Sequence, residues 1–171
     1  EKGRKLFLQE AQIARRLRHE NIIAVHDVGF TSEGVMYLSM EYAHGQSLRA
    51  LLLRYREERR YMPVRLAVAI ILQALEALEY AHRLVVHRDI KPENILLLKN
   101  ERVKVLDFGL AIAIEEEEGL EEKKQEKPSR KRKVVGTFAY AAPEQINHQP
   151  VDLRADIYAM GLLLRELLSL R

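Results

Sequence analysis

Apolar residues recur every three or four positions in four stretches of the chain, and this spacing predicts α-helices. Ser47 suits an N-cap before the second helix, because its side-chain oxygen can accept an amide hydrogen bond from the first turn. Pro63 suits the start of the third helix, where its missing N–H is not needed, and Asp152 or a neighbour would cap the fourth. The predicted helices span residues 5–18, 47–56, 63–81 and 155–170.

Two pairs of β-rich runs predict two antiparallel hairpins. The first pair covers residues 22–30 and 35–42, and the second covers residues 95–98 and 102–106. A short polar turn separates the two runs of each pair. Asp107 follows directly after the second hairpin, so the hairpin would return this residue toward its own start.

Residues 115–133 contain seven acidic and seven basic side chains. A segment of this kind buries almost no apolar surface. It is therefore predicted to be a mobile loop, although its glutamate and lysine content would also allow a frayed helix.

Composition narrows the class of protein. The 171 residues, 47% of them hydrophobic and 31% charged, suit one globular domain, and a net charge of only +3 does not favour nucleic acid as a partner. The absence of cysteine excludes disulfides and cysteine-based zinc sites, and it favours a reducing compartment. The longest apolar run, residues 66–72, is far shorter than the roughly 20 residues needed to cross a bilayer. We therefore expect no membrane segment within the chain and a cytoplasmic location, with attachment through other regions left open.

The residues that carry chemistry lie directly before and directly after the second hairpin. Residues 87–94 read His-Arg-Asp-Ile-Lys-Pro-Glu-Asn, and residues 107–109 read Asp-Phe-Gly. Nine fixed residues, each at roughly 5% usage, would coincide by chance about once in 10¹¹ sequences. This set resembles the protein kinase family of the serine/threonine, bacterial-like type. The resemblance continues through Gly-Thr at 136–137, Ala-Pro-Glu at 142–144, and Asp156.

The resemblance implies an α+β, protein-kinase-like fold with a mostly helical C-terminal lobe and a remnant of the small β-containing N-terminal lobe. Residues 1–171 would form a partial kinase domain. Residues 1–43 would be the small-lobe remnant and hinge, and residues 44–171 the incomplete large lobe. Residues 107–144 would be the activation segment.

The implied activity is transfer of the ATP γ-phosphate to serine or threonine hydroxyls of protein substrates. Asp89 would accept the proton of the acceptor hydroxyl or orient that hydroxyl, and Lys91 would reach the transferred phosphate. Asn94 and Asp107 would hold Mg²⁺, or Mn²⁺ as the alternative, because hard cations prefer oxygen ligands.

The same resemblance assigns the nucleotide pocket. Glu10 would pair with a lysine that contacts the α and β phosphates, although a solvated helix-surface glutamate is the plain alternative. Met40 would be the gatekeeper behind the adenine, and the backbone of Glu41 and Ala43 would bond the adenine edge. Leu96 would form the floor of the pocket, although apolar residues at such spacing also suit a core.

Substrate class and regulation are also implied by the resemblance. Lysine at position 91 marks serine/threonine kinases, and Thr137 would contact Asp89 and Lys91. Arg88 marks kinases whose activation segment is ordered by a phosphate. Ser129 has the one hydroxyl side chain between residues 108 and 136, so this residue would accept the phosphate. Two alternatives stay open: residues 115–118 supply permanent negative charge, or the charged insertion contacts nothing.

Two carboxylates have expected structural roles. Glu144 would pair with an arginine that lies further along in kinase domains and is absent from this sequence. Asp156 would accept amide hydrogen bonds from the His-Arg-Asp turn, or it would be an ordinary acid that complements the start of a helix.

The sequence departs from the family pattern at three points. It contains neither the glycine-rich phosphate loop nor the strand lysine, and residues 82–87 are one residue shorter than usual. Two explanations compete: an incomplete piece of an active kinase, or a kinase-like binding or scaffold module without catalysis. The intact residues at 89, 91, 94 and 107 favour the first explanation, and the Ala-Pro-Glu segment argues against a small-molecule phosphotransferase. We expect this chain by itself to be inactive.

Overall fold

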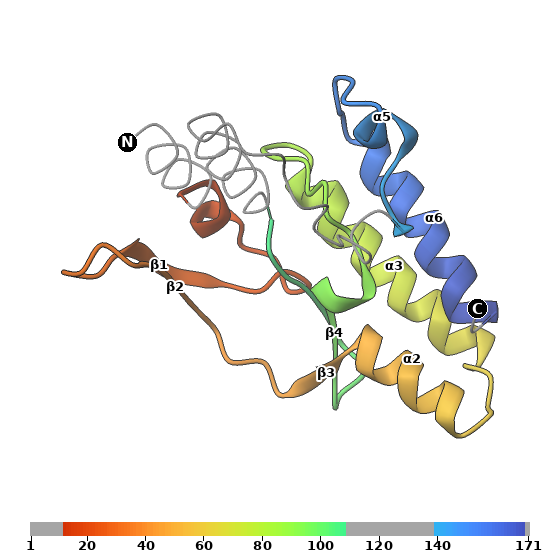
Figure 1. Cartoon of the computed structure of the whole chain (residues 1–171). Helices are drawn as coiled ribbons and strands as arrows, with labels where there is room; N and C mark the ends of the chain where they lie inside the picture. The colour runs from red at the N-terminus through yellow and green to blue at the C-terminus, as the bar shows by residue number, and fades with distance from the viewer. Residues whose placement is uncertain (1–11, 109–138, 170–171) are drawn as a thin grey trace, which may run out of the picture.

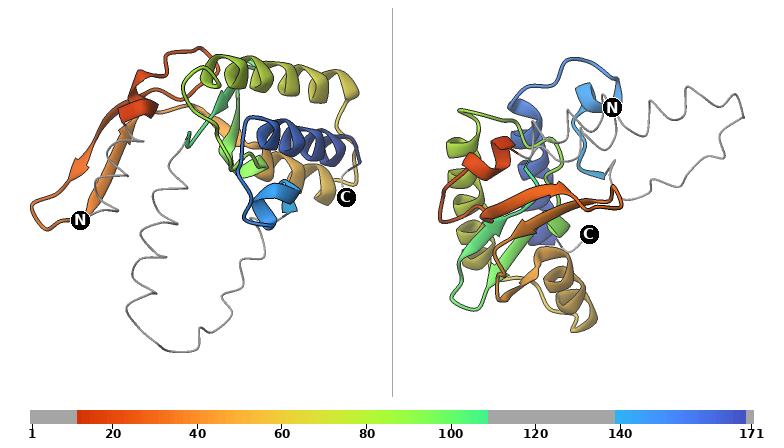
Figure 2. Two further views of the ribbon diagram at one scale, coloured as in Figure 1. Left: turned by 90° about the horizontal axis from the view of Figure 1, so that it is seen from above. Right: turned by 90° about the vertical axis from the view of Figure 1, so that its left-hand side faces the viewer.

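The computed structural model describes residues 12–108 and 139–169 (Figure 1). A β-hairpin and a short helical stretch at residues 12–16 form one part, and helices around a small sheet form the other (Figure 2). The fold is thus α+β and mostly helical in its C-terminal part, as predicted. In chain order the elements are β1 (Val25–Phe30), β2 (Met36–Met40), β3 (Gly45–Ser47), α2 (Leu48–Glu57), α3 (Val64–Ala81), the 3₁₀ turn η1 (Pro92–Asn94), β4 (Ile95–Leu98), β5 (Val103–Val105), α5 (Pro143–Ile146) and α6 (Arg154–Ser169).

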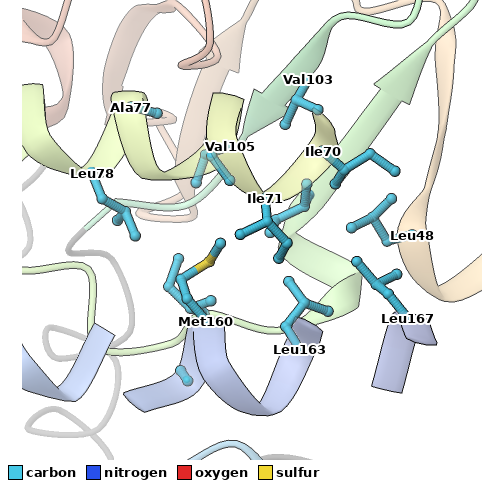
Figure 3. Packing of buried hydrophobic residues seen from close by; sticks show 14 of the residues in the cluster. Leu48, Ile70, Ile71, Ala77, Leu78, Val103, Val105, Met160, Leu163 and Leu167 are labelled. Carbon is cyan, nitrogen blue, oxygen red and sulfur yellow. The ribbon is translucent and has the colours of Figure 1, made fainter. Parts of the chain in front are cut away.

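The core of the helical part lies between α3, α6 and the sheet (Figure 3). The buried positions of α3 recur at the spacing of one helix face, and several of them are alanine, which lets the neighbouring elements approach closely. Leu163 and Leu167 of α6 and Val105 of β5 complete this core and are fully buried. The buried residues of α3 are Ala67, Ile70, Ile71, Ala74, Ala77, Leu78 and Ala81.

The predicted starts of the second, third and fourth helices are confirmed. Ser47 Oγ accepts the Ala50 N–H at 3.2 Å at the start of α2, and Pro63 immediately precedes α3. Asp152 Oδ1 accepts the Arg154 N–H at 2.9 Å at the start of α6. Of the first predicted helix, residues 12–16 are helical and residues 17–18 are not. Its residues 5–11 and the charged stretch 115–133 lie outside the described residues.

Both predicted hairpins are present, but the first begins later than expected. The Ile23 N–H donates to the Val105 carbonyl at 2.9 Å, and the Val105 N–H donates to the Asn21 carbonyl at 2.8 Å. Residues 21–23 therefore pair with β5, and the strand predicted at residues 22–30 is correct only from Val25 onward.

The strand β3 was not predicted. It pairs antiparallel with β4 and places Gly45 opposite Leu98 and Ser47 opposite Leu96. A Cβ atom at Gly45 would lie 2.5 Å from the Leu97 carbonyl oxygen. Glycine is thus required here by the close approach of two backbones.

Within the described residues, no helix is both long and apolar enough to cross a membrane.

Candidate active site

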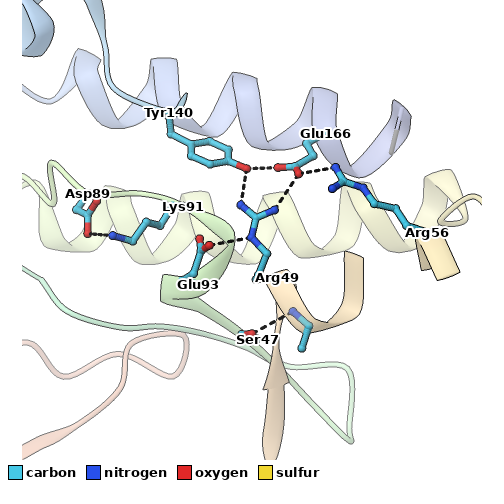
Figure 4. A network of polar contacts seen from close by, with 9 residues as sticks. Ser47, Arg49, Arg56, Asp89, Lys91, Glu93, Tyr140 and Glu166 are labelled. Carbon is cyan, nitrogen blue, oxygen red and sulfur yellow. Dashed lines mark hydrogen bonds and ion pairs between the residues drawn. The ribbon is translucent and has the colours of Figure 1, made fainter. Parts of the chain in front are cut away.

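The loop between α3 and β4 brings together three of the predicted site residues, and Figure 4 shows two of them, Asp89 and Lys91. Lys91 Nζ donates to Asp89 Oδ2 at 2.6 Å. Asn94 Nδ2 donates to the same oxygen at 3.0 Å and to the Asp89 carbonyl at 2.8 Å. The Asp89 carboxylate is therefore held in one orientation by a cation and an amide.

The backbone of this loop is held by Asp156 of α6. Asp156 Oδ2 accepts the His87 N–H at 2.8 Å, and Oδ1 accepts the Arg88 N–H at 2.7 Å. His82 Nε2 also lies 2.8 Å from Oδ2. Arg88 has a φ of 66°, a left-handed conformation that is uncommon outside glycine. The fully buried carboxylate thus stabilises a strained turn directly before Asp89.

His87 is a structural residue of this loop. It is fully buried, and its ring contacts that of Phe108 with centroids 4.7 Å apart. Its Nε2 lies 2.7 Å from the Leu106 carbonyl oxygen, and its Nδ1 accepts the Asp89 N–H at 3.2 Å. Because burial lowers the pKa of His87, the ring stays neutral, which fits one donor and one acceptor nitrogen.

The β4–β5 hairpin returns Asp107 toward the loop, since the Leu106 N–H donates to the Asn94 carbonyl at 2.9 Å. Burial raises the pKa of the Asp107 carboxyl, and the neighbouring charge of Asp89 acts in the same direction. A bound cation would relieve both effects. Asn94 donates both of its hydrogen bonds to Asp89 through Nδ2, so its Oδ1 is available as an oxygen ligand for a metal ion.

These residues fit a divalent cation that shares its coordination with phosphate. Among residues 12–108 and 139–169, no three acidic or histidine side chains gather into a complete metal site. Mg²⁺ typically binds through one or two carboxylates together with substrate phosphates and water. Asp107 with Asn94 matches that pattern.

The predicted adenine-contacting residues lie at the end of β2 and in the chain that follows this strand. Met40 ends β2, and Glu41 and Ala43 follow it. The Glu41 N–H donates to the Ala24 carbonyl at 2.8 Å, so of the two backbone groups of Glu41 only the carbonyl could make the predicted adenine contact. Leu96 lies on the face of β4 opposite to the buried Ile95, because side chains alternate along a strand.

The side chain of Glu41 has a second function in the structure. It accepts the Ala24 N–H at 3.1 Å and bonds Lys104 Nζ of β5. Burial opposes ionisation of Glu41, but the hydrogen bonds from Lys104 and from the Ala24 N–H, together with the nearby positive charge, outweigh it and lower the pKa of the carboxyl. Sequence reasoning did not identify Lys104.

A network around Arg49 was also missed. Its guanidinium donates from Nε to Glu93 at 2.8 Å, from Nη1 to Glu166 at 3.0 Å, and from Nη2 to the Tyr140 hydroxyl at 3.1 Å (Figure 4). The Tyr140 hydroxyl donates to Glu166, and Arg56 bonds Glu166 at 2.9 Å. Burial and the Glu166 hydrogen bond raise the pKa of Tyr140 to about 12, so Tyr140 keeps its proton.

The remaining predicted residues are distributed as follows. Glu144 lies in the first turn of α5, beside a shallow hollow that Asp152 and Arg154 also line. Glu10, Ser129 and Thr137 lie outside the described residues.

This combination of fold and loop defines a member of the kinase-like class, and comparison with known proteins identifies the family. The family model of the protein kinase domain matches residues 1–171 of the sequence, so the chain belongs to the protein kinase family. Proteins of this family use ATP and a divalent metal ion.

Similar proteins come from several bacteria. The chain is 41% identical over 169 residues to a probable serine/threonine-protein kinase of Streptomyces coelicolor, covering 96% of this chain and 24% of that protein. It is 37% identical over 167 residues to the serine/threonine-protein kinase PknB of Mycobacterium leprae, covering 95% of this chain and 25% of that protein. It is also 36% identical over 174 residues to the tyrosine-protein kinase MasK of Myxococcus xanthus, covering 96% of this chain and 25% of that protein. The chain spans about a quarter of the length of these relatives.

A solved structure supports the fold. The crystal structure of the Mycobacterium tuberculosis PknI kinase domain matches with a TM-score of 0.74 and 30% identity. The match covers 99% of this chain and 58% of that one. The chain therefore has the fold of part of a kinase domain.

Proposed function

We propose that this chain provides the catalytic centre of a serine/threonine protein kinase that transfers the γ-phosphate of ATP to protein hydroxyls, with Mg²⁺ as its metal. One observation carries the proposal. Asp89 is oriented by Lys91 and Asn94, while the hairpin brings Asp107 to the same loop. A module without catalysis has no need for this joint arrangement.

The residues divide the work of phosphoryl transfer. Asp89 orients the acceptor hydroxyl and takes its proton. Lys91, whose Nζ contacts Asp89 Oδ2 at 2.6 Å, would contact the transferred phosphate beside that carboxylate. Asp107 and Asn94 hold the metal ion. When bound, the metal and ATP supply the phosphoryl group and neutralise the charge that develops on it.

Serine or threonine is favoured over tyrosine as the acceptor by Lys91, two residues after Asp89. The tyrosine alternative has its own support, since one similar protein is named a tyrosine kinase. Peptides that differ only in carrying serine, threonine or tyrosine at the acceptor position discriminate the two directly. Transfer to tyrosine alone would overturn the assignment of substrate class.

The roles are tested in the full-length protein with two matched substitutions. Asp89→Asn is expected to lower phosphate transfer by roughly 10²–10⁴-fold and to leave binding of MgATP unchanged. Asp107→Asn is expected to weaken metal-dependent nucleotide binding itself. Asp152→Asn, at an exposed carboxylate that pairs with Arg154, serves as the control. Equal binding defects in the first two variants would contradict this division of roles, and wild-type protein that binds MgATP but transfers nothing would favour a scaffold.

A further inference from the structure

The segment of residues 139–146 is connected to the catalytic loop at two separate points, directly near one end of the loop and through Arg49 near the other. Gln145 of α5 contacts Arg88, and Tyr140 is connected through Arg49 to Glu93. Asp89 and Lys91 lie between these points. We refer to the two sets of contacts as the Gln145 clamp and the Arg49 clamp.

The Gln145 clamp acts on the peptide unit that joins Arg88 to Asp89. Gln145 Nε2 donates to the Arg88 carbonyl at 2.7 Å, and its Oε1 accepts the Ala142 N–H at 3.0 Å. The N–H end of the same peptide unit donates to His87 Nδ1 at 3.2 Å. One side-chain amide thus connects the start of α5 to a peptide plane whose two ends are both held.

The strain at Arg88 gives this contact its importance. A φ of 66° is strained in a non-glycine residue, so the peptide would relax if its partners were removed. Asp156 holds the N–H on one side of Arg88, and Gln145 holds the carbonyl on the other. Any rotation of that carbonyl also turns the backbone from which the Asp89 side chain extends.

The Arg49 clamp acts at the other end of the loop. Each of the three guanidinium nitrogens of Arg49 bonds a different partner, from η1, α6 and the segment that contains Tyr140. Glu93 is adjacent to Asn94, whose amide contacts Asp89. A planar fork with several donors is needed for this geometry, which the single nitrogen of lysine cannot reproduce.

We propose that Gln145 and Arg49 are positioning residues for Asp89, and that through them the placement of residues 139–146 sets the geometry of the catalytic loop. This inference rests on the proposed kinase function. It deepens that function by naming two residues outside the loop that hold the Asp89 backbone and the Asn94 end of the loop in place.

The Gln145 clamp is tested with Gln145→Glu in the full-length protein. The carboxylate still accepts the Ala142 N–H but cannot donate to the Arg88 carbonyl. We expect kcat to fall by roughly three- to tenfold, which corresponds to one net hydrogen bond, with an unchanged KM for MgATP. Gln149→Glu introduces the same charge at an exposed position nearby and is expected to match the wild type.

The Arg49 clamp is tested with Arg49→Lys and Tyr140→Phe. Lysine keeps a positive charge beside buried Glu166 but loses the fork, and phenylalanine keeps the ring but loses the hydroxyl. We expect both to lower kcat by a similar factor, roughly three- to tenfold, at constant KM for MgATP. Arg54→Lys, at an exposed ion pair on the same helix, and Tyr158→Phe, at a half-exposed ring, are the matched controls.

A second measurement separates positioning from simple loss of stability and does not require activity. Amide hydrogen exchange is expected to rise at residues 87–94 in the clamp variants while the buried face of α3 keeps its protection. Unchanged kcat together with unchanged exchange would overturn the inference, and so would a uniform rise in exchange across the chain. If the wild type itself transfers no phosphate, the proposed function fails, and the exchange pattern still decides whether the clamps hold the loop.

Discussion

At the catalytic turn, a single side chain satisfies several buried donors. Asp156 is 1% exposed, and its two oxygens accept the N–H groups of His87 and Arg88 and contact His82. Unsatisfied buried donors cost far more than an ordinary hydrogen bond contributes. The position of this carboxylate therefore determines whether the turn can keep the left-handed conformation of Arg88.

The substitution Asp156→Asn should expose this dependence. Asparagine offers one acceptor oxygen and directs its NH₂ group at a donor, so one backbone N–H stays buried without a partner. We expect the free energy of unfolding to fall by about 1–3 kcal/mol, together with a loss of phosphate transfer. Denaturant unfolding measures the first effect. Asp152→Asn is the control, and equal stability of the two variants would show that the turn does not need the carboxylate.

At the scale of elements, local signals account for what sequence reasoning predicted. The helices α2, α3 and α6 were predicted from apolar spacing, and Ser47 and Pro63 located the starts of the first two. The catalytic loop was predicted because its residues are contiguous. These features depend on neighbours within a few positions along the chain.

The elements that were missed depend on distant partners. The strand β3 is three residues long and pairs with β4 through backbone groups, some 50 positions away, so no side-chain pattern marks it. Arg49 looks like a solvent-facing residue of an amphipathic helix. Glu166 carried a usable signal: it occupies the buried face of α6 together with Ala159 and Leu163, and a carboxylate there requires a cationic partner.

The packing of α6 on α3 makes a direct prediction about stability. Leu163 is fully buried between these helices, so Leu163→Ala should lower the free energy of unfolding by about 2–5 kcal/mol. Leu168 lies on the same helix but is 39% exposed, and Leu168→Ala should have a much smaller effect. Chemical denaturation of both variants would show whether α3 and α6 form the central contact of the core.

At the scale of the whole molecule, one ion pair joins the β-hairpin to the helical part. Lys104 of β5 bonds the Glu41 carboxylate and donates to the Ile22 carbonyl at 3.1 Å. Glu41 in turn holds the Ala24 N–H. The chain leaving β2, where the proposed adenine contacts lie, is thereby tied to the strand that leads to Asp107.

This tie predicts a pH-dependent contribution to stability. The pKa of Glu41 is lowered from its ordinary value of 4.5, so its carboxylate stabilises the folded state above that pH, and the contribution disappears as the pH falls through the lowered pKa. Lys104→Met should reduce the free energy of unfolding by roughly 1–3 kcal/mol near neutral pH. The gap to the wild type should narrow as the pH falls through the lowered pKa of Glu41. A gap that is constant from pH 7 to pH 3 would contradict this account.

The contact between Gly45 and the Leu97 carbonyl sets a limit on sequence variation. A library randomised at position 45 and selected for folding should return glycine almost alone, since even a methyl group would push β3 away from β4. Position 161 offers the contrast, because nothing lies within 4 Å of a Cβ atom there. Gly161→Ala should raise the stability of α6 by about 0.5–1 kcal/mol. The two glycines thus differ in the substitutions that they tolerate. Gly45 has no room for a side chain, whereas Gly161 can be replaced.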